Sequence, residues 1–538
     1  MTRSSPVDTV NSMDAIVILA PRLPEYLSLA LADGSTPYER FRERLVHLRK
    51  LISEGRPDAP VCYVAAPGPA VDQLDKAEDW HAVSVAEPGD ASALFHALDT
   101  FLPAEIENLV LLWIDAPLFS PRIAAYLLTL QHYAVCDYTF GDGYPAGFAP
   151  EVLRRDALSG LSALSVQPQI PWERSVVFDA LSRDINAFDV ETEAARDDLD
   201  LLRLSLTVDV RGNYLFCRRL CEREGTLEIS TAPVPDPRSE RFDQESEPVL
   251  RLIQESPELR RTLPFYLQVQ LGTELLQRPF YLPEADPQWS GDAPGSGSHM
   301  SRDLWRRLLS ELAEWAPETT LSIGYRGEVS LHPEFPELLR DAAAYERLSL
   351  FVETSGLGWS EAATAALDGV TALIVELDAI EPAQYERIRG EGRDEALRFI
   401  EAARSRIPGR VYVQATRMRE NEWELQEFFN HWDAVEGVTP LIQKYNDFAG
   451  RLEQRQVADM APISRIPCWH LQRDMVLLHD GTVVRCLQDL DQEAVRGSFA
   501  ERSLQDLWDA GAEDMDAHLR AEYPGMCRSC DEYYTFNA

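Results

Sequence analysis

The sequence predicts the α/β fold class, with two successive α/β domains and a small C-terminal domain rich in cysteine. Short apolar runs alternate with amphipathic stretches from residue 13 to 200, and a second alternating series runs from 263 to 450. This alternation is typical of strands and helices that build a largely parallel sheet. Half of the eight cysteines lie after residue 450. The predicted parts are 1–200 (first α/β domain), 201–262 (helical and linker region), 263–450 (second α/β domain) and 451–538 (C-terminal domain).

Three apolar runs define the core strands of the first domain: AIVILA (15–20), PVCYVAA (60–66) and NLVLLWID (108–115). The stretch 38–52 between them has the spacing of an amphipathic helix. After residue 200 the sequence becomes mostly charged and helical, and its segment 231–248 is rich in proline and acidic residues, which predicts a linker.

Six candidate strands follow in the second domain, and helical patterns such as 301–314, 393–405 and 421–434 fill most of the gaps between them. Six strand–helix units predict a parallel sheet curled into a partial (β/α)6 barrel, whose functional face lies at the carboxyl ends of the strands. The strands are 265–271, 320–325, 348–353, 372–377, 410–416 and 437–443.

Composition excludes several classes of function. The 538 residues are 45% apolar, which is enough for real cores, and 89 acidic residues outnumber 51 basic ones for a net charge of −38. This balance argues against nucleic acids and anionic membranes as partners. The sequence has no run of 18 apolar residues and no signal-like N-terminus, so we expect a cytoplasmic protein.

The C-terminal cysteines are spaced like the ligands of one metal centre. Seventeen residues separate Cys468 from Cys486, forty separate Cys486 from Cys527, and two separate Cys527 from Cys530. A CxxC pair presents two thiolates to one metal, and two further thiolates complete the set. Four thiolates suit a 4Fe–4S cluster or a structural Zn²⁺ ion, and four inert thiols remain the third interpretation.

The residues between these cysteines resemble the SPASM domain, the auxiliary-cluster domain of many radical-SAM enzymes that modify peptides. Twelve residues separate Cys468 from Gly481 and four separate Gly481 from Cys486, which is similar to the CX9–15GX4C opening of that domain. Asp480-Gly481 also signals a hairpin. Because the sequence ends eight residues after Cys530, the resemblance implies the shortened form with one 4Fe–4S cluster, called a twitch domain.

The second α/β domain resembles a radical-SAM barrel that lacks its catalytic cluster. That family places CxxxCxxC after the first barrel strand, and in the equivalent segment 267–283 the three ligand positions fall on Leu275, Pro279 and Leu282, which cannot bind iron. Gly327-Glu328 resembles the family's GGEP motif for the AdoMet amine. The resemblance therefore implies that AdoMet is not cleaved. Cys217 and Cys221 have half of the cluster spacing but lie in a charged helical stretch, so we interpret them as incidental.

The first domain resembles the nucleotidyltransferase (GT-A) fold. Asp115-Ala116-Pro117 follows a core strand, as does the Mg²⁺-binding motif of that family, and Asp189 is similar to its second metal carboxylate. The Gly-rich loop that holds the triphosphate is absent, because AIVILA is followed by PRLPEYLSLALADGS. The resemblance leaves open a working transferase, a nucleotide-binding domain or a structural remnant.

The three-part layout resembles the spiro-SPASM proteins. The first interpretation is an iron–sulfur protein on a degenerate radical-SAM/SPASM scaffold, a pseudoenzyme that binds a peptide or partner protein or relays electrons. The second is a Mg²⁺-dependent nucleotidyltransferase whose C-terminal half recruits the substrate. The third is a zinc-stabilised scaffold. The expected cofactor is one 4Fe–4S cluster, with zinc as the alternative and Mg²⁺ or nucleotide at the first domain.

Overall fold

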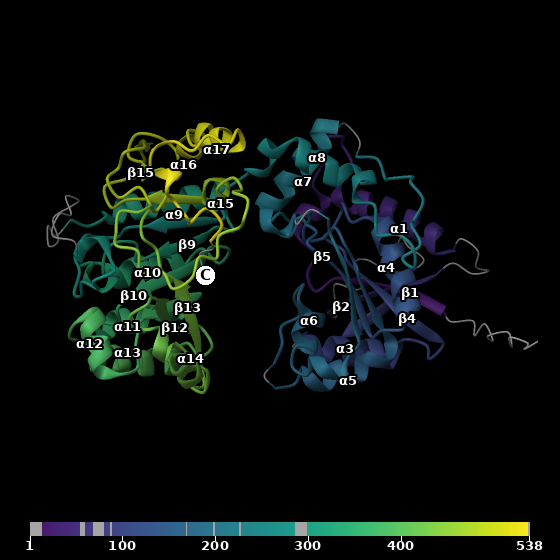
Figure 1. The fold of residues 1–538 in the computed structure, drawn as a ribbon, viewed down its shortest axis with the longest axis horizontal. Helices are drawn as coiled ribbons and strands as arrows, with labels where there is room; N and C mark the ends of the chain where they lie inside the picture. Colours follow the sequence, from purple (N-terminus) through teal and green to yellow (C-terminus); the bar gives the residue numbers. More distant parts are fainter. Residues whose placement is uncertain are drawn as a thin grey trace, which may run out of the picture. The chain divides into compact units, whose positions relative to one another are not determined.

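The computed structural model describes residues 13–53, 60–67, 80–86, 89–167, 169–196, 199–224, 227–285 and 298–535. The chain forms two compact units, Met1–Arg260 and Arg261–Ala538, each with its own sheet. Figure 1 shows both units, coloured along the sequence.

The first unit contains a seven-stranded sheet in the order β3-β2-β1-β4-β6-β5-β7. All neighbouring strands are parallel except at β6, which is antiparallel to both β4 and β5. The strands cover β1 (Met13–Leu19), β2 (Val61–Pro67), β3 (Trp80–Val85), β4 (Ile106–Trp113), β5 (Tyr138–Asp142), β6 (Glu151–Arg154) and β7 (Val190–Ala194).

Helices cover both faces of this sheet (Figure 1). Side chains alternate along a strand, so Ile16 and Ile18 of β1 enter one apolar core while Ala15 and Val17 enter the other. Helices α1, α4, α7 and α8 supply the first core, and α3, α5 and α6 supply the second. Their bounds are α1 (Pro37–Ser53), α3 (Ala91–Phe101), α4 (Pro121–Ala134), α5 (Leu158–Leu164), α6 (Val176–Leu181), α7 (Arg211–Glu224) and α8 (Pro248–Glu255).

The segment between residues 199 and 260 packs on the first unit. Cys217 and Cys221 lie on α7, fully buried among apolar side chains. Arg122 of α4, itself buried, donates hydrogen bonds to Glu247 Oε1 (2.7 Å) and to the carbonyl of Ala232 (2.9 Å). A buried guanidinium therefore holds the proline-rich stretch 231–248 against α4.

The second unit contains a nine-stranded sheet in the order β13-β12-β11-β10-β9-β8-β14-β15-β16. Strands β8 to β13 are all parallel and follow one another in chain order, which confirms the α/β class and the six predicted barrel strands. The six strands are β8 (Tyr266–Val269), β9 (Thr320–Ile323), β10 (Ser349–Thr354), β11 (Ala372–Glu376), β12 (Val411–Arg417) and β13 (Val438–Lys444).

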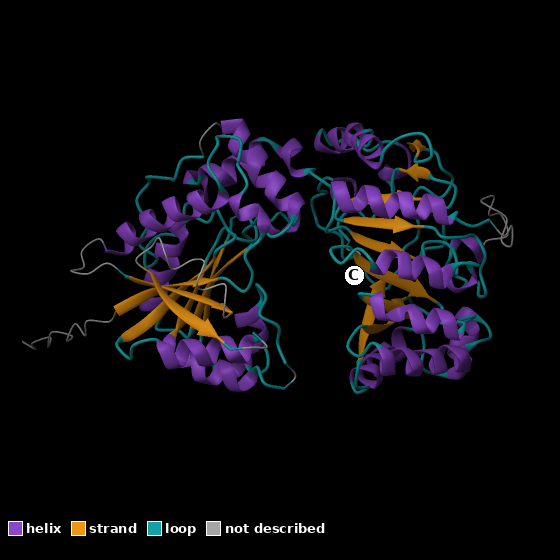
Figure 2. Ribbon diagram, turned by 180° about the vertical axis from the view of Figure 1, so that it is seen from behind, coloured by secondary structure: helices purple, strands orange, loops and turns teal. Residues whose placement is uncertain are grey.

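Helices alternate with these strands and pack along one side of the sheet, as Figure 2 shows. Helix α9 shows how the local sequence forms a helix. The side chain of Ser301 caps its first turn, and Trp305, Leu308 and Leu312 form its buried stripe. The helices are α9 (Arg302–Trp315), α10 (Phe335–Ala343), α11 (Glu361–Ala365), α12 (Pro382–Arg389), α13 (Arg393–Arg406) and α14 (Leu425–Asp433).

The C-terminal region extends the barrel sheet. Strand β14 (Asp474–Leu477) pairs in parallel with β8, and the hairpin to β15 (Thr482–Val484) turns at Gly481, whose φ is +91°. Arg261 packs on the Trp508 ring and donates to the carbonyl of Leu471 (3.1 Å), which fixes this region to the start of the barrel. Its other elements are β16 (Val495–Ser498), α15 (Trp469–Arg473), α16 (Leu504–Asp509) and α17 (Ala512–Leu519).

Candidate functional site

The four predicted cysteine ligands line one pocket, which we call the cysteine pocket. Cys468 precedes α15, Cys486 follows β15 by two residues, Cys527 lies in a 3-10 helix (Gly525–Arg528), and Cys530 follows that helix by two residues. None of the four forms a disulfide. In the described part of the chain, no group of three or more His, Cys, Asp or Glu side chains has the geometry of a ready-made metal-ion site. The four thiols thus line one pocket without being arranged as a metal-ion site.

The surroundings of the thiols fit a cluster of iron and sulfide. Burial raises the pKa of all four, that of Cys468 to about 12, so the thiols stay protonated until a metal displaces the protons. Backbone amides are directed at the sulfurs, and the N–H of Glu532 lies 3.4 Å from Cys530 Sγ. Such N–H···S hydrogen bonds stabilise bound thiolates and set the potential of a cluster.

Several polar side-chain atoms around the cysteine pocket have no hydrogen-bond partner among the described residues. Arg465 Nε, Arg485 Nε, His518 Nε2 and the Gln488 amide are buried and form no hydrogen bond to any residue that the structure describes. Arg465, His518 and Gln488 line the pocket together with the thiols. Buried donors are rarely left unsatisfied, and thiolates and sulfides would be acceptors for them. The donor set therefore fits a negatively charged iron–sulfur cluster held by Cys468, Cys486, Cys527 and Cys530.

The loop after β8 contains the other three predicted ligand positions. Leu275, Pro279 and Leu282 line a cavity of about 170 Å³ together with Gly327 and Glu328. The structure thus brings the segment that resembles a cluster loop next to the segment that resembles an AdoMet motif. A Cβ atom on Gly327 would lie 2.1 Å from the carbonyl oxygen of Gly272, so only glycine allows this approach.

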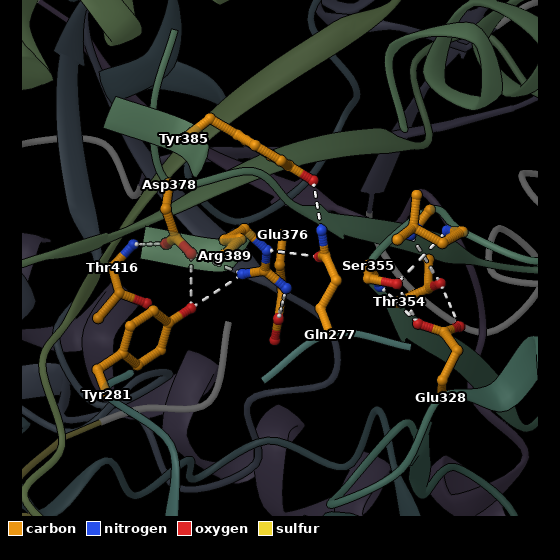
Figure 3. Close-up of polar contacts among 12 residues, drawn as sticks. Gln277, Tyr281, Glu328, Thr354, Ser355, Glu376, Asp378, Tyr385, Arg389 and Thr416 are labelled. Carbon is orange, nitrogen blue, oxygen red and sulfur yellow. Dashed lines mark hydrogen bonds and ion pairs between the residues drawn. The ribbon is translucent and has the colours of Figure 1, made fainter. Parts of the chain in front are cut away.

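Glu328 is already saturated by the protein. Its buried carboxylate accepts hydrogen bonds from Thr354 Oγ1 (2.6 Å) and from the backbone and hydroxyl groups of Ser355 (2.9 Å to the backbone N). Figure 3 shows this cluster at the carboxyl end of β10. A ligand amine would have to compete with these donors, which weakens the resemblance of Glu328 to an AdoMet-binding residue.

A buried arginine holds the loop after β8, and the sequence analysis did not identify it. Arg389 of α12 donates to Asp378 Oδ2 (2.6 Å), Tyr281 Oη (3.0 Å) and Gln277 Oε1 (3.1 Å), as Figure 3 shows. It also pairs with Glu376 (2.9 Å). Tyr281 and Gln277 belong to the loop, while Asp378 and Glu376 end the fourth barrel strand. The loop is therefore fixed by a guanidinium and two carboxylates.

The cavity beside this loop adjoins a second one of about 170 Å³, and we call the two together the barrel cavity. Glu353, Glu376, Leu282, Phe448 and Leu487 line both parts. Leu487 also lines the cysteine pocket, next to Cys486. The barrel cavity and the cysteine pocket are therefore neighbours within the second unit.

The structure separates the two carboxylates predicted to bind Mg²⁺ in the first unit. Asp115 follows β4 at its carboxyl end, whereas Asp189 precedes the amino end of β7. Strands β4 and β7 run in the same direction, because β6 is antiparallel to β4 and to β5 while β7 is parallel to β5. Asp115 therefore lies where these strands end, and Asp189 lies at the opposite side of the sheet, where they begin.

Asp115 instead pairs with an arginine. Arg174 Nη2 lies 2.6 Å from Asp115 Oδ2, and burial raises the pKa of this carboxyl group despite that partner. Arg174 also lines a cavity of about 170 Å³ with Trp113 and Glu151. The guanidinium thus occupies one carboxylate oxygen of Asp115, while Oδ1 is buried with no hydrogen-bond partner among the described residues.

Three comparisons place the chain among known proteins. Residues 468–531 match the SPASM model, described as an iron–sulfur cluster-binding domain, which confirms the coarse prediction of a C-terminal iron–sulfur domain. An uncharacterized protein of Treponema pallidum is 30% identical over 380 residues, which cover 68% of this chain and 99% of that protein. The chain therefore belongs to the same family as the Treponema protein.

Solved structures show weaker likenesses. BtrN in complex with AdoMet and 2-DOIA is 16% identical with a TM-score of 0.33, over 48% of this chain and 90% of that chain. Streptococcus suis SuiB bound to precursor peptide SuiA is 12% identical with a TM-score of 0.40, over 58% and 80%. A cytidylyltransferase from Leptospira borgpetersenii is 15% identical with a TM-score of 0.35, over 46% and 96%.

In the described residues, no helix is both long and apolar enough to cross a membrane.

Proposed function

We propose that the protein is an iron–sulfur protein of the spiro-SPASM type, in which a radical-SAM-like barrel binds a ligand without cleaving AdoMet. One observation carries this proposal. Four cysteines converge on the cysteine pocket, whereas Leu275, Pro279 and Leu282 occupy the ligand positions of the barrel loop. One cluster in the C-terminal domain is therefore expected, held by Cys468, Cys486, Cys527 and Cys530, and none in the barrel.

The polar lining of the barrel cavity supports ligand binding. The interior of a closed (β/α)8 barrel is filled by branched apolar side chains. Here Gln268, Glu353, Glu376 and Gln414 come from four strands of the sheet and line the cavity instead. A polar cavity at the carboxyl ends of parallel strands is the usual place for a substrate or ligand.

The charges of this lining favour a ligand that carries a positive group. Glu353 Oε1 accepts from Ser322 (2.5 Å) and Glu376 Oε2 accepts from Arg389 (2.9 Å). The structure describes no hydrogen bond to the second oxygen of either carboxylate. Glu353 lies opposite Ile374 in the β10–β11 register, so Glu376 is its diagonal neighbour on the same face.

The cations that line the barrel cavity already have acidic partners. Arg326 Nε lies 3.2 Å from Glu284 Oε1, Arg389 pairs with Asp378, and Lys444 pairs with Asp531 (2.9 Å). Burial, together with the charge of Glu376, raises the pKa of Glu353 to about 7, although the hydrogen bond from Ser322 lowers it. A lysine or arginine side chain of a peptide would relieve this unfavourable charge, so we propose a basic peptide segment as the ligand.

The proposed cluster site lies next to the ligand site in the barrel cavity. Among the residues that the structure describes, Leu487 alone lines the cysteine pocket and both parts of the barrel cavity, and His470 lines the pocket and one part. An iron–sulfur cluster bound to the four cysteines supplies one-electron storage and transfer. A ligand in the barrel cavity would therefore bind beside a redox centre.

The geometry does not favour the nucleotidyltransferase alternative. Asp115 and Asp189 lie at opposite sheet edges, and Asp115 is bonded to Arg174. A Mg²⁺ site needs carboxylates on the same side of a bound nucleotide.

Glu353→Gln is expected to weaken the binding of a basic peptide about tenfold or more. The substitution removes the carboxylate charge, so the charge-assisted hydrogen bond between Glu353 and the peptide cation, worth about 1.5–3 kcal/mol, is lost. Binding by the unchanged protein should also weaken as the pH falls from 8 to 6, because protonation near pH 7 neutralises Glu353. Isothermal titration calorimetry with a Gly/Ser decapeptide carrying one central lysine measures both effects.

Two controls distinguish peptide binding in the barrel cavity from binding to the protein surface. Glu386 of α12 is exposed and outside the barrel cavity, so Glu386→Gln should bind like the unchanged protein. The same peptide with acetyl-lysine should not bind. Equal affinity for both peptides, or an unchanged affinity in Glu353→Gln, would contradict the proposed ligand class.

A further inference from the structure

His518 lies beside the cysteine pocket, and a contact with the backbone fixes which of its ring nitrogens carries the proton. The side chain of His518 on α17 is 2% exposed and lines the pocket. The backbone N–H of Cys468 lies 3.3 Å from His518 Nδ1. Because a backbone N–H can only donate, Nδ1 must accept, and the ring proton of the neutral imidazole is then on Nε2.

His518 Nε2 has no acceptor among the described residues. Its ring is held edge-on by Tyr523, with 5.0 Å between ring centroids, and Nδ1 is fixed by Cys468. The ring therefore cannot turn Nε2 toward another partner without losing the backbone contact. An oriented, buried N–H group without an acceptor costs about 1–3 kcal/mol unless a bound group satisfies it.

Helix α17 presents this donor together with the charged groups around the pocket. Asp514 lies four residues before His518, so both share one face of the helix. Asp514 pairs with Arg485 (2.9 Å) and Arg496 (3.6 Å). One helix face thus carries His518, which lines the cysteine pocket, and the carboxylate that pairs with Arg485 and Arg496.

We propose that His518 Nε2–H donates a hydrogen bond to a sulfur of the bound cluster and raises its reduction potential. The inference rests on the proposed ligand set of Cys468, Cys486, Cys527 and Cys530. A donor to sulfur stabilises the more negative, reduced cluster more than the oxidised one, so its removal lowers the potential. His518 is a positioning and tuning residue, because the four thiolates already complete the ligand set.

His470 differs from His518 although it lines the same pocket. Its Nδ1 lies 2.5 Å from Asp474 Oδ2 and its Nε2 lies 3.3 Å from Thr535 Oγ1. Both ring nitrogens of His470 therefore have partners inside the protein. Only His518, of these two histidines, offers a free ring donor.

The test is an anaerobic redox titration of the full-length, iron-loaded protein, followed by EPR. In His518→Phe, the ratio of reduced to oxidised cluster at the midpoint potential of the unchanged protein should fall at least threefold, which corresponds to about 28 mV for a one-electron couple. His518→Gln carries an amide N–H of similar reach and should recover at least half of this shift. An unchanged midpoint in His518→Phe would overturn the inference.

Two further variants keep the test decisive. His332 is also buried, but both of its ring nitrogens have backbone partners (2.9 Å to the Met300 carbonyl oxygen and 3.1 Å to the Glu334 N) and it lies outside the cysteine pocket. His332→Phe should leave the midpoint unchanged, and an equal shift there would overturn the inference.

If His518→Phe loses iron, His518→Asn and His518→Gln are compared instead. Asn keeps the acceptor for Cys468 but does not reach the Nε2 position, so it should lower the midpoint at least twice as much as Gln does.

Two other outcomes distinguish this inference from the proposed function. Strong coupling of the cluster to a histidine ¹⁴N nucleus would show direct ligation by His518 and overturn the tuning role, whereas coupling to one exchangeable proton lost in His518→Phe would support it. An iron-free protein after anaerobic reconstitution would overturn the proposed function itself, whatever the His518 variants do.

Discussion

Cys527→Ala is expected to reduce the iron content from about four atoms per chain to near zero. Cys527 is buried in the cysteine pocket, and its removal leaves only three of the four thiolates in the proposed ligand set. His470 cannot replace the missing thiolate, because both of its ring nitrogens have partners inside the protein. Iron and acid-labile sulfide analysis of the anaerobically purified variant measures the loss.

The matched control for this variant is Cys217→Ala. Cys217 is also buried, but it lies on α7 of the first unit among apolar side chains. Its variant should keep all of its iron, and circular dichroism should show that both variants remain folded. Full iron retention in Cys527→Ala would show that the four cysteines are not the ligand set.

Arg389→Met is expected to destabilise the second unit by about 3–5 kcal/mol, because it removes the only described cationic partner of buried Asp378. The side chains of Arg389 and Asp378 are 2% and 1% exposed, so water cannot replace the lost contact. The loop at Gln277 and Tyr281 should become mobile, since two of its anchors disappear. Urea unfolding followed by tryptophan fluorescence measures the free energy, and hydrogen exchange measures the loop.

Two variants frame the Arg389 result. Arg387 lies on the same helix but is exposed, with one 3.5 Å contact to a carbonyl, so Arg387→Met should change stability by less than about 0.5 kcal/mol. Adding Asp378→Asn to Arg389→Met removes the unpaired charge and should restore part of the loss. If Arg389→Met alone is as stable as the unchanged protein, the network around Arg389 does not hold the loop.

The sequence predicted the barrel strands well because each is a local apolar run. VYVQATR and ALIVE, for instance, are rich in β-branched and apolar residues, which favour strands. Strand β14 was predicted only as part of a hairpin. Its parallel pairing with β8, about two hundred residues earlier, is a non-local contact that a local pattern does not contain.

Site residues divide in the same way. The spacing of Cys468, Cys486, Cys527 and Cys530 located the cysteine pocket, because CxxC and CX9–15GX4C are local signals. Arg389 was missed because it lies on a highly charged helix, PAQYERIR, whose buried side only the fold reveals. The acidic pair at the end of the fourth barrel strand, Glu376 and Asp378, was the one signal that a buried cation is near.

Asp189 shows a different limit. The resemblance to the nucleotidyltransferase family suggested a second metal carboxylate at this residue, but the sequence does not state strand direction. Strand β6 is antiparallel to its neighbours, and the resulting order places Asp189 at the edge opposite Asp115. His518 could not be found either, since a single histidine on an amphipathic helix carries no local sign of function.

Counting iron and sulfide in the anaerobically purified full-length protein tests the central claim most directly. We expect about four irons and four sulfides per chain, from one cluster in the cysteine pocket and none at Leu275, Pro279 and Leu282. About eight irons would contradict the account, because a second cluster would then exist and the barrel would have kept its redox centre. One zinc ion and no iron would contradict it as well, because four thiolates would then hold a structural ion.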